Sequence, residues 1–367
     1  MHILMTADTV GGVWTYTREL VSGLARRGHQ ITLVSFGKLP SNEQVRWMDG
    51  LSSLRFHPTE YRLEWMQDSE QDIRASRSFL QALIVDLKPD LLHFNQYAYG
   101  NLPGDVPRIV VAHSDVVSWW IAVHGEEPAE GAWMRWYGST VMEGLKGARA
   151  VVAPSQTMLD SIQRHYLQPR LARVIYNGRD PRLFDPYRQK EDVVLSVGRI
   201  WDQAKQVSLL LQHQQAAAVW IAGPDENPEG LRGGFVENSR DSAIQFVGTQ
   251  SENALLDLYA RASLYAATSR YEPFGLAPVE AAFSGCALIL NDIESFRELW
   301  GDSGYYFHRN SGRSLASAIR ELTTNHQLRR DYAQHAYQHA MRHFQADRMV
   351  EEYERLYGNL VAHEAAA

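Results

Sequence analysis

The sequence contains a single cysteine, Cys286, among its 367 residues, which excludes an internal disulfide framework. A chain without disulfides is suited to a reducing compartment. Basic residues are also in the minority, because 36 Lys and Arg are outnumbered by 43 Asp and Glu, and the formal net charge is -7. Binding to nucleic acid irrespective of its sequence requires a basic field, so we expect no nucleic-acid partner.

Long hydrophobic runs are absent as well. No eighteen apolar residues follow one another, so no segment of this sequence is expected to span a membrane. The N-terminal sequence MHILMTADTVGG has neither a basic region nor a long apolar core, so we expect no signal peptide. These features predict a cytoplasmic protein, and they leave open a peripheral position at the inner face of the membrane.

The sequence does contain a repeated alternation of apolar strands and helices. An apolar strand at residues 2–7 is followed by the glycine turn Gly11-Gly12 and then by apolar residues at helical spacing over 13–24. This opening is typical of a Rossmann-like domain, although the dinucleotide fingerprint G-x-G-x-x-G is missing. A plain tight turn is the alternative interpretation of the two glycines. Further strands are expected at residues 31–36, 91–94, 108–112, 150–155 and 173–175.

The pattern restarts after the turn Tyr176-Asn177-Gly178 and a Pro-rich link at residues 180–186. A length of 367 residues is long for one core and comfortable for two domains. We therefore predict an α/β protein with two Rossmann-like doubly wound domains, residues 1–180 and 181–344, followed by a terminal helix at 345–367. Strands of the second domain are expected at residues 193–197, 219–222, 244–248, 264–268 and 286–290.

Chemistry is expected in residues 270–291, RYEPFGLAPVEAAFSGCALILN. Pro273 fits the first turn of a helix, where no backbone N–H is needed, and Gly275 lets a ligand come close to the backbone. The N–H groups of Phe274, Gly275 and Leu276 would then point out of a helix N-terminus, which is an anion-binding site.

Two carboxylates belong to the same stretch. Glu272 precedes the expected helix, and Glu280 lies about two turns into it among apolar neighbours. An unpaired charge there is costly, so Glu280 needs a partner, and sugar hydroxyls would serve. The two glutamates are expected to touch different parts of one extended, phosphate-containing ligand. A surface helix with two solvated glutamates is the alternative.

Three further polar residues follow expected strands directly or closely. Ligands of open α/β sheets collect beyond the carboxyl ends of strands. Arg199 and Lys205 follow the strand at 193–197 and are placed to neutralise a diphosphate, Arg199 as a fork and Lys205 as a point charge. Two surface cations are the alternative. His113 follows the strand at 108–112, although a single histidine is more often structural.

Glu272 and Glu280, with EPFG at the start of the motif, resemble the E-x7-E signature of retaining glycosyltransferases of family 4. The segment GRIWDQAK, residues 198–205, resembles the GR…K element that holds the donor phosphates in that family. It is one residue longer than the commonest spacing, and Gln206 replaces a frequent glycine. The resemblance implies the GT-B fold, in which two Rossmann-like domains face each other across a cleft, and transfer of a sugar from a nucleotide-diphosphate donor.

The resemblance also implies roles for individual residues. Glu272 would hold hydroxyls of the donor sugar, Glu280 would hold the ribose, and His113 would contact the sugar from the first domain. Arg199 and Lys205 would hold the diphosphate.

The glycine turn Gly11-Gly12 would let the donor phosphates and the acceptor approach the backbone. The terminal helix would cross back onto the first domain.

The expected ligands follow from the same resemblance. No tightly bound cofactor is expected, because the nucleotide sugar is a donor substrate, with UDP favoured over GDP. No acidic metal cluster such as D-x-D accompanies the site, so we expect no metal ion. The acceptor is expected to be a carbohydrate, a lipid-linked molecule or a small molecule, and no oligomeric state is predicted.

Two further sets of residues have more than one interpretation. Trp119, Trp120, Trp133 and Trp136 are read as core packing, with an aromatic wall for the acceptor or a contact with a membrane or partner as alternatives. His335, His339 and His343 recur at a spacing of four, which can bind metal, but their polar surroundings favour a solvated helix face.

Two rival functions are weighed. A glycoside hydrolase would use Glu272 and Glu280 as paired carboxylates, but both would have to flank one bond. A non-catalytic two-lobed protein would bind the nucleotide sugar without turnover.

Overall fold

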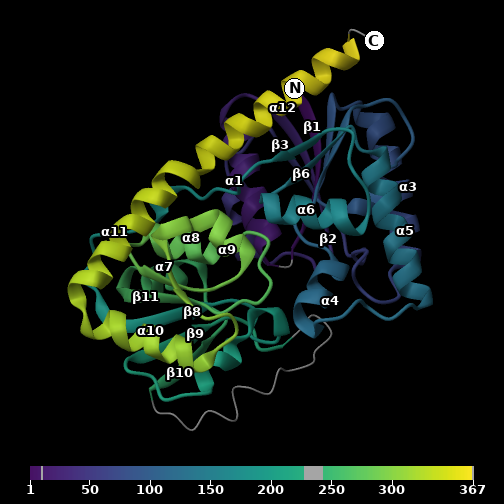
Figure 1. Ribbon diagram of the computed structural model, residues 1–367. Helices are drawn as coiled ribbons and strands as arrows, with labels where there is room; N and C mark the ends of the chain where they lie inside the picture. The colour runs from purple at the N-terminus through teal and green to yellow at the C-terminus, as the bar shows by residue number, and fades with distance from the viewer. Residues whose placement is uncertain (10, 227–242, 366–367) are drawn as a thin grey trace. The chain divides into compact units, whose positions relative to one another are not determined.

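Two parallel β-sheets, each in its own unit of the chain, make up the computed structural model, which describes residues 1–9, 11–226 and 243–365 (Figure 1). Unit 1 consists of Met1–Gly178 and Ala346–Ala367, and unit 2 of Arg179–Gln345. Neighbouring strands pair in parallel throughout both sheets, as expected for strands joined by helical crossovers. The predicted α/β class with two Rossmann-like units is confirmed.

The sheet of unit 1 has seven strands in the order β3-β2-β1-β4-β5-β6-β7. The order runs outward from β1 in one direction and then resumes from β4 in the other, so the topological switch lies between β1 and β4. The strands are β1 His2–Asp8, β2 Gln30–Phe36, β3 Leu54–Pro58, β4 Leu91–Phe94, β5 Arg108–Val111, β6 Ala150–Ala153 and β7 Ala172–Val174.

Successive side chains of each strand point to opposite sides of the sheet. Both faces therefore carry apolar residues, and helices cover both. Ile3 of β1 belongs to a core that includes Leu20 of α1 and Tyr353 of α12, whereas its neighbour Leu4 belongs to a second core with Tyr137 of α5. The helices are α1 Gly12–Arg26, α2 Asn42–Val45, α3 Glu70–Leu87, α4 Val116–His124, α5 Ala132–Gly147, α6 Gln156–His165 and α12 Ala346–Ala365.

Among the described residues of unit 2, the sheet has six strands in the order β10-β9-β8-β11-β12-β13, with its switch between β8 and β11. The strands are β8 Glu191–Val197, β9 Ala218–Ala222, β10 Ile244–Gly248, β11 Ala262–Ala267, β12 Ala287–Asn291 and β13 Tyr305–Phe307. The helices are α7 Glu252–Arg261, α8 Leu276–Phe283, α9 Glu294–Trp300, α10 Gly312–Thr324 and α11 His326–His343.

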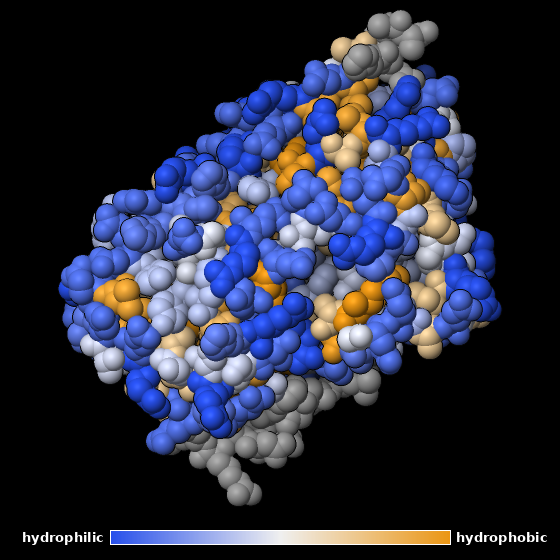
Figure 2. Space-filling model, viewed as in Figure 1, coloured by the Kyte–Doolittle hydropathy of each residue, from blue (hydrophilic) through white to orange (hydrophobic). Residues whose placement is uncertain are grey.

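Most of the surface in Figure 2 is hydrophilic, and hydrophobic side chains appear there in separate patches, one of them over α4. Trp119 and Trp120 of α4 are half-buried, while Trp133 and Trp136 of α5 pack against the core of unit 1. Core packing is therefore confirmed for the α5 pair. Within the described ranges, no helix combines the length and the apolar character needed to cross a membrane.

Candidate active site

A small cavity in unit 2 lies at the carboxyl ends of β8 and β11, where the strand order reverses. Its lining includes Gly198, Lys205, Thr268, Ser269 and Glu272. The Lys205 ammonium hydrogen-bonds to Oε2 of Glu272, 67 positions further along the chain, and the Ser269 hydroxyl donates to the same oxygen over 3.0 Å. Two predicted site residues therefore meet where doubly wound sheets bind their ligands.

Lys205 is positioned through its backbone. It ends the 3-10 turn Gln203–Lys205, whose N-cap residue Asp202 accepts a hydrogen bond from the Ala204 N–H over 2.9 Å. The Thr268 hydroxyl donates to the Lys205 carbonyl over 2.7 Å, which ties this turn to the end of β11. After β8 the chain forms 3-10 segments at Gln203–Lys205 and Val207–Leu211.

The backbone conformation of Gln206 explains why the resembled GR…K element often has a glycine at this position. Its φ is 49°, in the left-handed region that favours glycine. With its amide in the orientation that its neighbours require, Gln206 donates to the Thr268 carbonyl over 3.2 Å and to Asn310 Oδ1 over 2.8 Å. It also accepts from Arg270 over 2.6 Å. These three hydrogen bonds offset the backbone strain and brace the loop that carries Lys205.

Helix α8 begins later than predicted. Its first residue is Leu276 and its N-cap is Gly275, with a φ of 86°, so the placement of Pro273 in the first helical turn is wrong. Pro278 is instead the third helical residue, where a missing N–H also costs nothing. Phe274 packs its buried side chain edge-on against Phe344, with ring centroids 5.4 Å apart.

The N–H groups at the N-terminal end of α8 therefore belong to partly different residues from those predicted. The N–H groups that have no partner within the helix are those of Gly275, Leu276 and Ala277, and Phe274 is not among them. Gly275 lies close to the cavity residue Glu272, because a Cβ at position 275 would come within 3.0 Å of Glu272 Cγ. The helix end and Glu272 therefore belong to one local site.

Glu280 is buried, as predicted, but its partner comes from the protein itself. Arg179 Nε lies 2.9 Å from Glu280 Oε1, and Arg179 NH2 lies 3.7 Å from Glu252 Oε1. Arg179 is 3% exposed and Glu280 is 9% exposed. Arg179 already neutralises the carboxylate, so Glu280 has a partner within the protein, and its contact with the ribose stays a prediction.

Tyr259 lies beside this ion pair. Burial, followed by the neighbouring Glu280 carboxylate, raises the pKa of Tyr259 well above its ordinary value, so the phenol stays neutral.

Arg199 is turned away from the pair formed by Lys205 and Glu272. Its guanidinium contacts Asp202 Oδ2 over 2.7 Å and lies 5.3 Å from the centre of the Trp201 ring. Its side chain is 36% exposed, and Arg199 is not one of the residues that line the cavity. The structure therefore brings Lys205, and not Arg199, into contact with Glu272.

His113 lies at the carboxyl end of β5 in unit 1. Its Nε2 is 2.8 Å from Asn95 Oδ1, and its ring meets the Tyr16 ring edge-on with centroids 4.6 Å apart. Burial, and then the nearby His93, lowers the pKa of His113 to about 3, so the ring is neutral at ordinary working pH. Asn95 follows β4 as His113 follows β5. The same signal, a polar residue just past a strand, would have found Asn95 in the sequence.

Gly11 and Gly12 form the turn between β1 and α1. Gly11 is the N-cap of α1 and has a φ of 82°, a backbone conformation that requires glycine, and Gly12 is the first helical residue. The preceding residue lies outside the described part of the chain.

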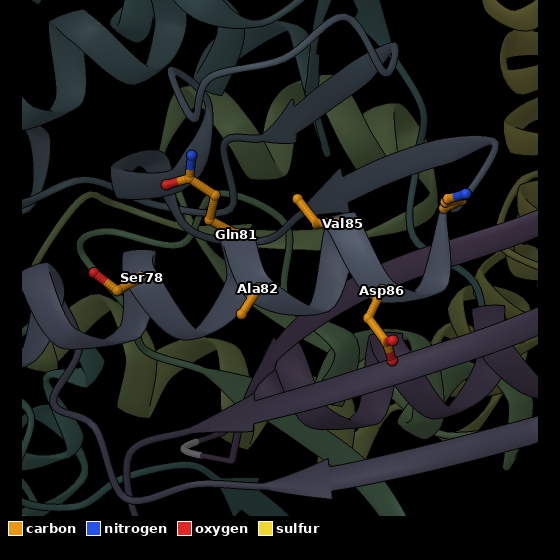
Figure 3. A pocket seen from close by; sticks show the side chains of 6 residues that line it. Ser78, Gln81, Ala82, Val85 and Asp86 are labelled. Carbon is orange, nitrogen blue, oxygen red and sulfur yellow. The ribbon is translucent and has the colours of Figure 1, made fainter.

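Two other features lie apart from these residues. A shallow hollow on the outer face of α3 is lined by Ser78, Gln81, Ala82, Val85 and Asp86, together with Lys88 (Figure 3). None of the predicted site residues lines it.

Two of the three histidines of α11 lie side by side, with the ring centroids of His339 and His343 4.6 Å apart. His335 and His343 are exposed, whereas His339 is half-buried and its Nε2 donates to the Leu299 carbonyl over 2.7 Å. Within the described ranges, no group of three or more His, Cys, Asp or Glu side chains is arranged to hold a metal ion. The solvated-face interpretation therefore applies to two of the three histidines.

Comparisons with known proteins cover both units. Residues 10–183 match the family model described as Glycosyltransferase Family 4, and residues 184–339 match the one described as Glycosyl transferases group 1. The GDP-mannose:cellobiosyl-diphosphopolyprenol alpha-mannosyltransferase of Xanthomonas campestris is 30% identical over 194 residues, which are 50% of this chain and 50% of that protein. The chain spans about half the length of the curated mannosyltransferases of this kind that it matches.

Solved structures resemble the whole chain. Sucrose-phosphate synthase from Thermosynechococcus elongatus has a TM-score of 0.82 at 18% identity and covers 99% of both chains. The Anabaena protein HepE in complex with UDP and glucose has a TM-score of 0.75 at 16% identity, over 98% of this chain and 100% of that one. At these identities the likeness is one of fold.

Proposed function

Because the chain belongs to glycosyltransferase family 4 and has the GT-B fold, we propose that it moves a hexose from a nucleotide-diphosphate sugar to a hydroxyl acceptor with retention of configuration. The observation that carries this proposal is the pairing of Lys205 with Glu272 in the cavity at the carboxyl ends of β8 and β11. A cation, a carboxylate and the amide end of α8 are gathered there, as a sugar diphosphate would require.

The donor is proposed to rearrange this pair when it binds. Its diphosphate competes with Glu272 for Lys205 and accepts hydrogen bonds from the amide end of α8. Glu272 is thereby released to accept hydrogen bonds from hydroxyls of the sugar. Arg199 supplies a second cation to the diphosphate after it gives up its contact with Asp202.

The remaining contacts are proposed from the family resemblance. Glu280, whose side chain is 11% exposed beside Arg179, holds the ribose, and His113 contacts the sugar. Gly11 and Gly12 allow the phosphates and the acceptor to approach the backbone.

The chemical step is proposed to be a front-face substitution. The bond between the sugar C1 and the diphosphate breaks, the acceptor oxygen bonds to C1 on the same face, and the acceptor proton passes to the departing phosphate oxygen. Negative charge grows on the nucleotide diphosphate as it leaves. Lys205 and the α8 amides stabilise that charge most strongly in the transition state, so no metal ion is needed.

The donor base and the acceptor are proposed at the level of a class. HepE was solved with UDP and glucose, whereas the Xanthomonas relative is named for GDP-mannose, and we favour UDP for this protein. The acceptor is a carbohydrate, a lipid-linked molecule or a small molecule that carries a hydroxyl.

A donor screen tests the proposed function. Binding to the native state raises the melting temperature, so UDP-glucose, UDP-galactose and GDP-mannose are compared by thermal shift, and hydrolysis of the best binder is then measured with and without EDTA. We expect one nucleotide sugar to stabilise the protein and to be hydrolysed slowly, at the same rate with EDTA. Stabilisation with neither hydrolysis nor transfer to any acceptor would favour a binding protein. Release of sugar from an oligosaccharide without a nucleotide would favour a hydrolase.

Substituting Gly275 by alanine is expected to impair donor turnover. An alanine at a φ of 86° is strained by about 1–2 kcal/mol. Its Cβ would also press on Glu272 Cγ at 3.0 Å, and displacing a substrate-positioning group in this way lowers kcat by about 10- to 100-fold.

Gly125→Ala is the matched control for this substitution. Gly125 has a φ of 78° in unit 1, and no atom lies within 4 Å of a Cβ placed there. Its variant should lose similar stability and keep its turnover. Equal turnover in the two variants would contradict a role for Gly275 beside Glu272.

A further inference from the structure

A chain of hydrogen bonds, buried at Tyr357 and His93 and partly buried at His113, leads from α12 to the end of β5 within unit 1. Tyr357 of α12 contacts His93 Nδ1 over 2.6 Å, and His93 Nε2 lies 3.1 Å from Asn95 Oδ1. The same Asn95 oxygen lies 2.8 Å from His113 Nε2. We infer that Asn95 and Tyr357 are positioning residues that hold His113 protonated at Nε2, so that its Nδ1 is an obligate hydrogen-bond acceptor for a sugar hydroxyl. The reference to a sugar rests on the proposed function.

The orientation of the Asn95 amide decides the protonation of both histidines. Asn95 Nδ2 is 2.7 Å from the backbone carbonyl of Thr6, which can only accept a hydrogen bond. Rotating the amide by half a turn would place two oxygens face to face at that distance. The backbone N–H of Asn95 also donates to the Thr6 hydroxyl over 3.1 Å, which fixes the residue against β1. Oδ1 therefore faces the two imidazoles, and it too can only accept.

Each histidine must donate to that oxygen through Nε2. Burial lowers the pKa of His93 and of His113 to about 3, so each neutral ring carries one proton. If either Nε2 lacked its proton, two acceptors would face each other at 2.8 Å or 3.1 Å in a buried site. In both rings the proton is consequently on Nε2, and Nδ1 carries a lone pair.

Tyr357 completes the chain at its far end. Burial raises the pKa of Tyr357 well above its ordinary value, so its hydroxyl keeps the proton and donates to His93 Nδ1. The Tyr16 hydroxyl lies 3.4 Å from His93 Nε2, which is too long to replace the bond to Asn95. The tautomer of His93 is therefore supported from both sides, by Tyr357 and by Asn95.

The sheet topology brings these residues together. Thr6 lies in β1, Asn95 directly follows β4, and His113 lies just beyond β5, and these three strands are neighbours in the sheet. The hydrogen-bond chain therefore passes the switch between β1 and β4 at Asn95 and ends at the neighbouring strand β5, at the edge of the sheet where ligands bind. A neutral His113 with its proton committed to Asn95 accepts a hydrogen bond from a hydroxyl and does not act as a general acid.

Nitrogen NMR on the unliganded protein tests the inference directly. The protein is labelled with 15N in its 14 histidines, and the signals of His113 and His93 are assigned by their loss in His113→Gln and His93→Gln. In long-range proton–nitrogen spectra we expect protonated Nε2 and unprotonated Nδ1 signals for both residues. A protonated Nδ1 at His113 overturns the inference. This measurement requires no turnover, so its result can contradict the inference without contradicting the proposed function, and the reverse is also true.

Tyr357→Phe removes one hydroxyl from the chain and keeps the aromatic ring. His93 Nδ1 then loses its donor in a buried site, and the His93 and His113 nitrogen signals should move toward a mixture of tautomers. The kcat/KM for hydrolysis of UDP-glucose or GDP-mannose, whichever the wild type hydrolyses, should fall by about 5- to 30-fold.

Tyr353→Phe is the matched control in the same helix. Its ring also packs on His93, with centroids 5.4 Å apart, but the Tyr353 hydroxyl does not contact that histidine. We expect wild-type nitrogen signals and a kcat/KM within about twofold of wild type, because the removed hydroxyl interacts with Tyr16 and is not a member of the Tyr357–His93–Asn95–His113 chain. Wild-type signals in Tyr357→Phe, or equal losses in both variants, would overturn the positioning role of Tyr357.

Discussion

Substituting Lys205 by methionine is expected to lower kcat for sugar transfer by roughly 10²- to 10³-fold, the usual effect of removing one group that stabilises transition-state charge. Methionine keeps the aliphatic stem, which packs against Gly198 in the cavity, and removes only the ammonium. Glu272 still accepts a hydrogen bond from Ser269, and its side chain is 15% exposed. Because only 19% and 15% of the Lys205 and Glu272 side chains are exposed, loss of the ammonium should lower the free energy of unfolding by about 1–3 kcal/mol, and rates are compared at equal folded fraction.

Arg188→Met is the control for loss of a positive charge in unit 2. Arg188 pairs with Asp257 at 3.1 Å and its side chain is 50% exposed, and it does not line the cavity. Steady-state rates with the donor found by the screen are compared at the same ionic strength. If the turnover of Lys205→Met is within about threefold of that of Arg188→Met, Lys205 does not stabilise the transition state. Such a difference is smaller than the tenfold change in rate that corresponds to about 1.4 kcal/mol.

Glu280→Ala is expected to destabilise unit 2 by about 3 kcal/mol, because it leaves the buried Arg179 guanidinium without its close partner. Arg179 is 3% exposed, and the carboxylate of Glu252, 3.7 Å away, compensates in part only. Chemical denaturation followed by fluorescence would measure the loss. A double variant with methionine at positions 179 and 280 should recover most of it, since an apolar pair can replace a buried ion pair.

Glu252→Ala is the matched control for that result. Its carboxylate also faces Arg179, but the Glu252 side chain is 45% exposed, so its removal should cost less than about 1 kcal/mol. Similar stability in Glu280→Ala and Glu252→Ala would show that the buried pair contributes little. A loss of transfer in Glu280→Ala must therefore be compared with its folded fraction. Glu280→Gln, which keeps a hydrogen-bond acceptor beside Arg179, is the better variant for testing the proposed ribose contact.

Much of the fold was predictable because parallel strands buried on both faces read as continuous apolar runs. Residues 2–7, 31–36 and 193–197 are of this kind, and each lies in an observed strand. The edge strands β3 and β13 were missed. Leu54–Pro58 contains no fully buried residue and lies in a polar stretch, and Tyr305–Phe307 has three residues, too few for any period to appear.

The site was predictable residue by residue, but its pairings were not. Lys205 and Glu272 each follow a strand in the sequence, yet their contact depends on β8 and β11 being neighbours in the sheet. Arg179 was missed because it follows an Asn-Gly turn and precedes a Pro-rich link, a context typical of exposed residues. Its burial depends on residues far apart in the sequence, because Glu280, 101 positions later, pairs with it and the Arg179 backbone N–H donates to the Phe344 carbonyl.

The start of α8 shows a limit of local signals. Pro273 and Pro278 are both compatible with a first helical turn, and the pattern alone does not separate them. The left-handed backbone of Gly275 decides between them in the structure.

The place of α12 in unit 1 has a consequence for how the chain acquires its structure during synthesis. Tyr353 and Tyr357 are fully buried against the core that α1 shares with the sheet, and Val350 fills the space over Gly23. The ribosome makes these residues only after all of unit 2. The apolar face of nascent unit 1 that α12 covers therefore stays exposed to solvent until residues 179–345 have been synthesised. Unit 1 is begun first and completed last.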